Sequence, residues 1–262
     1  MPKIPIRDME ANYVEEGAGF PLILIHGLNG DSTGWAKVMP EFAKSYRTIA
    51  LDVRGHGGTS KPDIPYSVKQ FSEDLFEFFQ KLNLNQAHLL GLSMGGAIAQ
   101  QFALDHPERI RSLILVSTFS YIDSYAQRAF LRLRKGLEEG GYPAFFDEVV
   151  KIAFTPEYVA ANAGAIADLK QKRIQINSPV AIARATDALM AFDLKEEISR
   201  ISVPTLIISG KEDEFTPIHL AEQIHHSIKG SEWKIIRGVG HNLYLEKPAE
   251  MVQIVLEFLG RH

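Results

Sequence analysis

Six short runs of apolar residues recur along the chain, and turn-forming residues such as glycine and aspartate bound them. The runs are almost continuously apolar rather than alternating, which is typical of parallel strands buried on both faces. Segments between them, such as residues 68–82, carry apolar residues at helical spacing. The pattern predicts an α/β fold, with a hairpin in residues 4–15 and further strands at residues 22–25, 48–51, 87–90, 113–116, 205–208 and 234–236.

The alternation of strands and helices stops after residue 118 and resumes only near residue 203. The stretch between these points has helical patterning, and turn-forming residues break it at 140–143, 155–156 and 178–179. Prolines at these breaks favour helix starts over a flexible linker. We therefore predict a cap of about four helices over residues 120–198, inserted into a core domain made of residues 1–119 and 199–262.

Composition narrows the class of protein. The chain has 262 residues, of which 45% are hydrophobic and 23% charged, as expected for one globular core with an insertion. The net charge of -4 gives no basic surface for nucleic acid or anionic lipid, so small-molecule partners fit better. Neither a secretory signal nor a run of 18 apolar residues is visible, and we expect a cytoplasmic protein without a membrane span. No cysteine is present to form a disulfide, and both a monomer and a homodimer stay open.

One five-residue motif carries the strongest chemical signal. Residues 91–95 are Gly-Leu-Ser-Met-Gly, and they lie between a predicted strand and a segment of helical composition. A serine on such a sharp turn takes strained dihedral angles, and the flanking glycines leave room where a Cβ would clash. The N–H groups at the start of the helix point to the same place and favour an oxyanion. The motif predicts a nucleophile elbow with Ser93 as the nucleophile.

A serine hydroxyl is a poor nucleophile at neutral pH and needs a base that a carboxylate orients. Both partners should lie in loops at the carboxyl ends of strands, where an open parallel sheet has its crevice. Asp213 and His241 each follow a predicted strand, and the order Ser93, Asp213, His241 is the one that accompanies a nucleophile elbow. Asp213 is preferred for its short reach and its place in the loop over the neighbouring carboxylates Glu212, Glu214 and Glu246.

Two backbone N–H groups are expected to hold the oxyanion. Gly27 follows the strand at residues 22–25 and lets backbone amides approach a ligand. The predicted donors are Leu28 and Met94, the residue after the nucleophile. We predict no metal site and no cofactor, because spacings such as that of His219 and His225 do not place two ligands on one helix face.

These residues together resemble the α/β-hydrolase superfamily over essentially the whole chain. The motifs that carry the resemblance are His26-Gly27, residues 52–57 (Asp-Val-Arg-Gly-His-Gly), the elbow, residues 105–109, residues 210–217 and His241 with Glu246-Lys247-Pro248. The resemblance implies a doubly wound sheet of eight mostly parallel strands, with a helical cap over the catalytic residues. The chain looks most like small bacterial carboxylesterases, 3-oxoadipate enol-lactonases and carbon–carbon bond hydrolases. It departs from dehalogenases and epoxide hydrolases, which carry aspartate in place of Ser93, and from the Gly-Gly-Ser-Trp elbow of proline iminopeptidases.

The expected function is hydrolysis of a carboxylic ester or lactone of a small, partly apolar substrate through an acyl-enzyme on Ser93. Two alternatives stay open, namely cleavage of a carbon–carbon bond in a vinylogous diketone, and a ligand sensor of hydrolase fold with little turnover. The expected substrate contacts are apolar residues near the predicted crevice: Trp35, Phe119, Met190, Phe215 and Leu243. The predicted cap also offers arginines for a substrate carboxylate, as an enol-lactone would require: Arg128, Arg132, Arg134, Arg173 and Arg184.

Overall fold

The computed structural model describes residues 2–262, which form an eight-stranded sheet with helices on both faces. The strands are β1 (Lys3–Ile6), β2 (Met9–Glu16), β3 (Pro21–Ile25), β4 (Arg47–Leu51), β5 (Ala87–Leu92), β6 (Ile110–Val116), β7 (Thr205–Gly210) and β8 (Glu232–Ile236). Their order in the sheet is β1-β2-β4-β3-β5-β6-β7-β8. Strand β2 is antiparallel to both of its neighbours, and the pairs from β4 to β8 are parallel. The predicted fold class and the N-terminal hairpin are confirmed.

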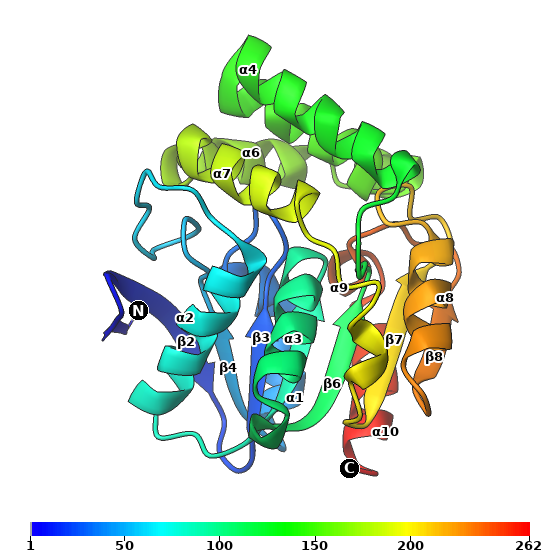
Figure 1. Ribbon diagram of the computed structural model, residues 1–262. Helices are drawn as coiled ribbons and strands as arrows, with labels where there is room; N and C mark the ends of the chain where they lie inside the picture. The colour runs from blue at the N-terminus through cyan, green and yellow to red at the C-terminus, as the bar shows by residue number, and fades with distance from the viewer. Residues whose placement is uncertain (1) are drawn as a thin grey trace.

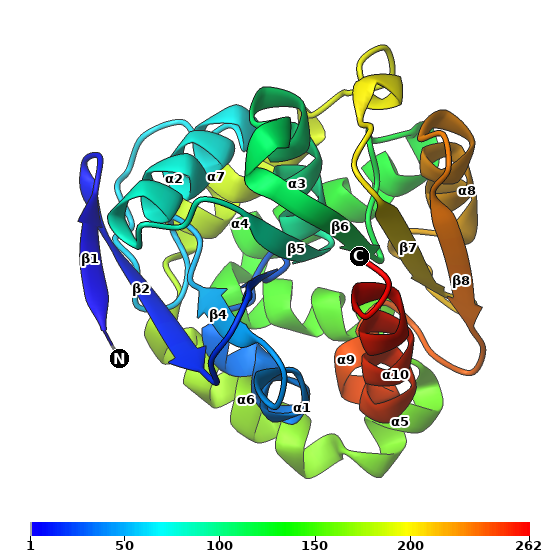
Figure 2. The same ribbon diagram turned by 90° about the horizontal axis from the view of Figure 1, so that it is seen from below.

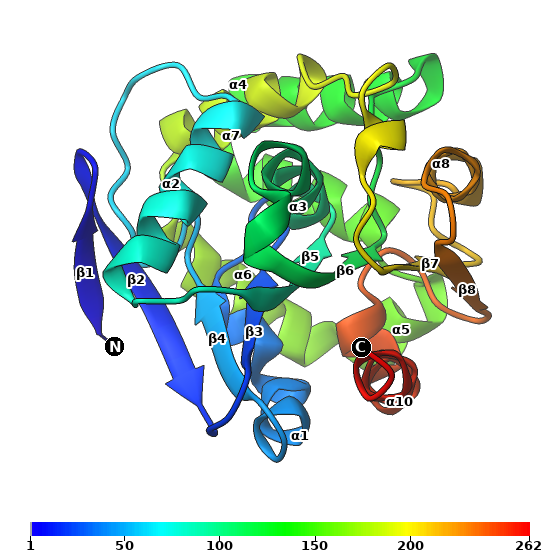
Figure 3. The same ribbon diagram turned by 60° about the horizontal axis from the view of Figure 1, so that its bottom comes forward.

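Burial of the parallel strands explains their continuous apolar sequence. Every residue of β5 and β7 is buried, so neither face of these strands needs polar side chains. One face of the sheet carries α2 (Val68–Lys81), α3 (Met94–Asp105) and α8 (Ile218–Ser227), and the other carries α1 (Met39–Ala43), α9 (Leu243–Glu246) and α10 (Pro248–Leu259). Figures 2 and 3 show α2 and α3 on one side of the sheet, and α1 and α10 on the other. Short 3₁₀ segments span Ser32–Lys37, Pro107–Arg109 and Ile198–Arg200.

Helix α2 shows how the pattern specifies an element. Ser67 caps its N-terminus by accepting a hydrogen bond from the backbone N–H of Gln70 at 3.0 Å. Phe71, Leu75 and Phe78 follow at spacings of four and three residues, so they share one face, and each is at most 2% exposed. Burying each of these side chains stabilises the fold by about 1.5–3 kcal/mol. The stripe is therefore core, as the sequence indicates.

Four helices between β6 and β7 form a separate layer, and we call them the cap helices: α4 (Ser124–Ala153), α5 (Pro156–Ala161), α6 (Ala163–Ile176) and α7 (Pro179–Met190). Figure 1 shows α4, α6 and α7 above the end of the sheet at which the parallel strands finish. Helix α4 changes direction at Gly141, whose φ of 64° favours glycine. The chain enters and leaves this layer at one place, because Tyr121 and Asp193 form an antiparallel β-bridge. No helix in residues 2–262 combines the length and apolar character needed to cross a bilayer.

Candidate active site

Ser93 lies on the turn between β5 and α3, where the sequence predicts a nucleophile. Its backbone has φ 53° and ψ −114°, a conformation that costs a residue with a side chain about 1–3 kcal/mol. The turn is held from both sides, because the N–H of Ser93 donates to the carbonyl of Val116 at 2.9 Å and its carbonyl accepts from Thr118 Oγ1 at 2.7 Å. The strain is thus held by hydrogen bonds to the segment at the end of β6.

The two glycines of the motif allow α3 to begin against the sheet. A Cβ on Gly95 would lie 2.1 Å from the carbonyl oxygen of Ile25, and a Cβ on Gly91 would lie 2.3 Å from that of Gly95. Both contacts are with backbone atoms that cannot move aside, so any larger residue would push the helix away from β3 and β5. The close approach fixes where the first N–H groups of α3 point.

Asp213 and His241 form a buried pair in the loops after β7 and β8. Oδ2 of Asp213 lies 2.9 Å from Nδ1 of His241, and the residues are 5% and 4% exposed. The carboxylate also accepts hydrogen bonds through Oδ1 from the N–H groups of Phe215 at 2.9 Å and Thr216 at 2.8 Å. Since the carboxylate faces Nδ1, that nitrogen carries the proton and Nε2 is left with a free lone pair.

Thr216 is a member of this site that sequence reasoning missed. Its hydroxyl donates to Oδ2 of Asp213 at 2.7 Å, and the hydroxyl oxygen of Thr216 lies 3.1 Å from Nδ1 of His241. The Nδ1–H of His241 therefore faces both oxygens, which fixes the plane of the ring. The signal in the sequence is a threonine three residues after an aspartate, a spacing that lets the loop fold back on the carboxylate.

Ser93 and His241 line one small cavity of about 40 Å³ beneath the cap helices. Leu28 and Phe215, both predicted site residues, line it as well, together with Asn242. The hydrogen bonds among residues 2–262 include none between Ser93 Oγ and His241 Nε2, although such bonds in ligand-free enzymes are often long and tighten when substrate binds. The cavity thus brings together the nucleophile and base that the sequence placed 148 residues apart, at positions 93 and 241.

The loop after β3 brings Leu28 to the cavity, and a buried histidine supports it. Nε2 of His26 accepts the N–H of Val53 at 3.0 Å, so Nδ1 carries the proton and lies 2.8 Å from the carbonyl of Gly27. Burial lowers the pKa of His26, which keeps the ring neutral in this role. The N–H groups of Leu28 and Met94 make no hydrogen bond to another residue of the described chain, 2–262. Both N–H groups are thus left to donate to another acceptor.

The cap helices bind the same loop through buried polar side chains. The hydroxyl of Tyr142 donates to Oδ1 of Asn29, which has a positive φ of 68°, and Asn177 donates to both side chains. Burial raises the pKa of Tyr142 to about 12, so this hydroxyl stays a donor. Arg173 of α6 forms an ion pair with Asp31, and both side chains are at least nine-tenths buried. Asn29 and Asp31, the residues on either side of Gly30, are thus held by the cap helices.

The predicted apolar contacts divide into two groups. Phe215 lines the cavity and lies 5.0 Å from the ring of His241. Trp35, Phe119 and Leu243 are at most 1% exposed and pack in the two cores of the sheet, not among the cavity-lining residues. Met190, at the end of α7, packs against one of these cores and is also outside the lining. The sequence identified apolar residues near the strand ends, but it did not show which of them face the cavity and which pack in the cores on either face of the sheet.

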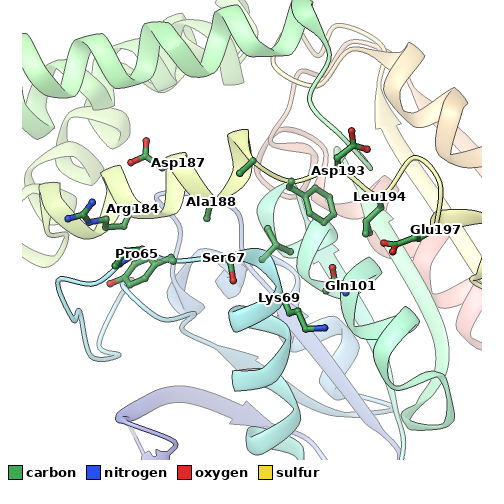
Figure 4. A pocket seen from close by; sticks show the side chains of 14 residues that line it. Pro65, Ser67, Lys69, Gln101, Arg184, Asp187, Ala188, Asp193, Leu194 and Glu197 are labelled. Atoms are coloured by element: carbon green, nitrogen blue, oxygen red, sulfur yellow. The ribbon is translucent and has the colours of Figure 1, made fainter.

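A wider hollow of about 330 Å³ opens elsewhere, between the cap helices and the flank of the sheet. Figure 4 shows its lining side chains, which come from α7 and the segment after it, from α3 and from the start of α2. Lys69 and Arg184 stand among acidic residues there, Asp187, Asp193 and Glu197. Of the residues that the sequence suggests for the site, Arg184 alone lines this hollow among the described residues. The predicted nucleophile, base and oxyanion donors do not, so its size alone does not make it the active site. No group of three His, Asp or Glu side chains within residues 2–262 is arranged to hold a metal ion.

A doubly wound sheet with a serine on a strand-to-helix elbow and an Asp–His pair in neighbouring loops defines an α/β hydrolase. The sequence pattern of the alpha/beta hydrolase fold family matches residues 21–248, and the chain belongs to that family. The resemblance seen in the motifs is confirmed.

Individual relatives differ in their named activities. The crystal structure of the enol-lactonase from Burkholderia xenovorans LB400 superposes with a TM-score of 0.90 at 26% identity, covering 99% of this chain and 100% of that chain. The 2-hydroxy-6-oxo-6-(2'-aminophenyl)hexa-2,4-dienoic acid hydrolase of Metapseudomonas resinovorans is 29% identical over 97% of this chain and 88% of its own. The proline iminopeptidase of Lactobacillus acidophilus is 30% identical over 98% of this chain and 97% of its own. The relatives therefore support the class of α/β hydrolases, and the substrate has to be inferred from the site itself.

Proposed function

We propose that the protein is a serine hydrolase that cleaves a carboxylic ester or lactone of a small, partly apolar substrate through an acyl-enzyme on Ser93. One observation carries the proposal: Ser93 on its strained elbow and His241, which is paired with the buried Asp213, line a single cavity. A weak nucleophile, a base with a free Nε2 and a carboxylate that orients the base are the parts that acyl transfer needs.

In the proposed reaction, Oγ of Ser93 attacks the acyl carbonyl carbon while Nε2 of His241 takes the hydroxyl proton. Asp213 holds the imidazole in the required tautomer and stabilises the imidazolium. The N–H groups of Leu28 and Met94 donate to the oxyanion, and loss of one such donor raises a barrier by about 2.7–4 kcal/mol. His241 then gives its proton to the leaving alkoxide, which departs as the alcohol. Water, deprotonated by the same Nε2, attacks the acyl carbon. The bond from this carbon to Oγ then breaks, Nε2 returns the proton to Oγ, and the acid leaves with Ser93 restored.

The first test is the rate of p-nitrophenyl acetate hydrolysis by the parent protein and by Ser93→Ala, between pH 5 and pH 9. We expect Ser93→Ala to lower kcat at least about 10³-fold, and activity to rise with deprotonation of a histidine. Ser117→Ala is the matched control, because Ser117 is also buried at a strand end with a positive φ of 45° and its hydroxyl has no partner in the described chain. Its rate should stay within about twofold of the parent rate.

A fluorophosphonate probe followed by intact mass measurement shows whether Ser93 reacts at all. A parent protein that neither hydrolyses esters nor takes the label, although folded, would contradict the proposal and favour a sensor role. A vinylogous diketone and a proline anilide are compared with the esters, because one relative is named for a dienoic acid and another for proline iminopeptidase activity. If either compound is turned over faster than the esters and this activity is lost in Ser93→Ala, the role of Ser93 as nucleophile is supported and the proposal of an ester or lactone substrate is overturned.

A further inference from the structure

We propose that the cavity above Ser93 takes a short, uncharged acyl group, and that side chains of α4 set its length limit. The inference rests on the serine-hydrolase function proposed above. A cavity needs about 10–15 Å³ for each water-sized group, so 40 Å³ holds about three or four non-hydrogen atoms. An acetyl group has three such atoms and a propionyl group has four.

One wall of the cavity comes from both halves of the kinked helix α4. Leu133 lies before the kink at Gly141, while Val149 and Ala153 lie after it and, four residues apart, share one face. All three side chains line the cavity, and they make this wall apolar. A longer acyl chain would have to displace the side chain of Leu133 or Val149.

The wall is fixed to the loop that carries the catalytic base, so it cannot simply retreat from a longer substrate. The carbonyl of Ala153 accepts hydrogen bonds from the N–H of His241 at 3.2 Å and from Nδ2 of Asn242 at 3.1 Å. Two residues later, Oγ1 of Thr155 donates to Oε2 of Glu246 at 2.7 Å. Moving this end of α4 outward would therefore also move the backbone of His241.

The charge of the lining excludes a carboxylate on the acyl side. Within residues 2–262, no lysine or arginine lines this cavity. The cap arginines expected as carboxylate ligands are engaged elsewhere: Arg132 with Glu148, Arg134 with Asp187, Arg173 with Asp31, Arg184 with Asp63, and Arg128 over the ring of Tyr125. An anionic acyl group would thus be desolvated against leucine, valine and alanine without a cation to balance it.

The experiment measures kcat/KM for p-nitrophenyl acetate, propionate, butyrate and octanoate in the parent protein and three variants. We expect the parent to prefer acetate and propionate over octanoate by at least about tenfold. Val149→Ala and Leu133→Ala should each raise the butyrate-to-acetate ratio about tenfold, the discrimination typical of one methylene in an apolar pocket. Val150→Ala is the matched control, because Val150 is the adjacent, half-buried valine of the same helix and does not line the cavity. Its ratio should stay at the parent value.

Charge is tested separately with two esters of equal shape, mono-p-nitrophenyl succinate and p-nitrophenyl 4-methylvalerate. We expect the neutral ester to react at least about tenfold faster in the double variant Leu133→Ala with Val149→Ala, where the loss of five side-chain carbon atoms gives both acyl groups room. A preference for octanoate in the parent, an equal ratio in Val149→Ala, Leu133→Ala and Val150→Ala, or faster reaction of the succinate would each overturn this inference alone. Absence of all hydrolysis and of Ser93 labelling would instead overturn the proposed function, and this inference with it.

Discussion

Replacing Arg173 by methionine removes the cation that faces the buried carboxylate of Asp31. The two side chains are 7% and 5% exposed, and methionine fills much of the space of the arginine stem, so the change is mainly electrostatic. Breaking a buried pair in this way costs about 3–5 kcal/mol. Asp31 would still accept the N–H of Thr33 at 2.9 Å, which places the expected loss in unfolding free energy near the lower end, about 3 kcal/mol.

The size of this loss depends on pH. Burial opposes ionisation of Asp31, but Arg173 together with the hydrogen bonds from Thr33 outweighs it, and the pKa of the carboxyl is lowered in the folded protein. The pair therefore contributes stability above the unfolded pKa of about 3.9, and this stability disappears as the pH falls through the folded value. In Arg173→Met the burial remains and only the hydrogen bonds from Thr33 oppose it, so the pKa of Asp31 rises relative to the parent protein. The difference between parent and variant should then shrink as the pH falls from neutral, because a protonated carboxyl needs no cation.

Urea unfolding followed by far-ultraviolet circular dichroism at pH 7.5 and pH 5.0 measures both effects. Arg184→Met is the matched control in the same layer, because its pair with Asp63 is 3.3 Å long and the side chains are 41% and 69% exposed. Such exposed pairs contribute about 0–1 kcal/mol. The double variant Asp31→Asn with Arg173→Met should recover most of the loss, since no charge is left unpaired. A loss below 1 kcal/mol at pH 7.5, or one no larger than that of the control, would refute the reasoning.

Two further predictions concern the base and the core. Thr216→Val should lower kcat about three- to tenfold with little change in KM, because Asp213 loses a donor and the ring of His241 loses a guide; an unchanged kcat in protein with a parent-like circular dichroism spectrum would contradict this role. Burial lowers the pKa of His56 to about 3, so the buried neutral ring costs no stability above the unfolded pKa of about 6.5. As the pH falls below about 6.5, the free energy of unfolding decreases by about 1.4 kcal/mol per pH unit, because the unfolded chain binds a proton that the folded protein does not. His56→Gln should reduce the slope of unfolding free energy against pH between 6 and 5 by about that amount. Equal slopes for the parent and the variant in urea unfolding would contradict a neutral, buried His56.

The chain itself predicts the sheet because its strands are buried on both faces. Strands such as β5 and β7 have no polar side that could confuse strand with loop. Parallel strands also finish at one edge, so a serine, an aspartate and a histidine that each follow a strand are expected to meet there. The structure places Ser93 and His241 on one cavity for this reason.

Contacts between distant segments leave no such pattern. Asn29 and Tyr142 are 113 residues apart and meet only because the cap helices fold back over the loop after β3. From the sequence alone, the charge of Arg173 could face solvent, a substrate or an acidic side chain. The packing of α6 places it against Asp31. Trp35 and Leu243 are apolar residues close to strand ends, but the face of the sheet against which they pack makes them core.

The β-bridge between Tyr121 and Asp193 has a consequence for how proteins of this design change over generations. Because the N–H of Leu194 also donates to the carbonyl of Ser120 at 2.8 Å, the segments that lead into and out of the cap helices lie side by side. For strands β6 and β7, the cap helices are therefore equivalent to a long loop whose two ends are fixed next to each other. Closing a longer or shorter loop between fixed ends changes the free energy only logarithmically with length. Recombination at this junction therefore costs little in chain closure, and an exchanged set of cap helices must chiefly supply new partners for Asn29 and Asp31 in place of Tyr142 and Arg173.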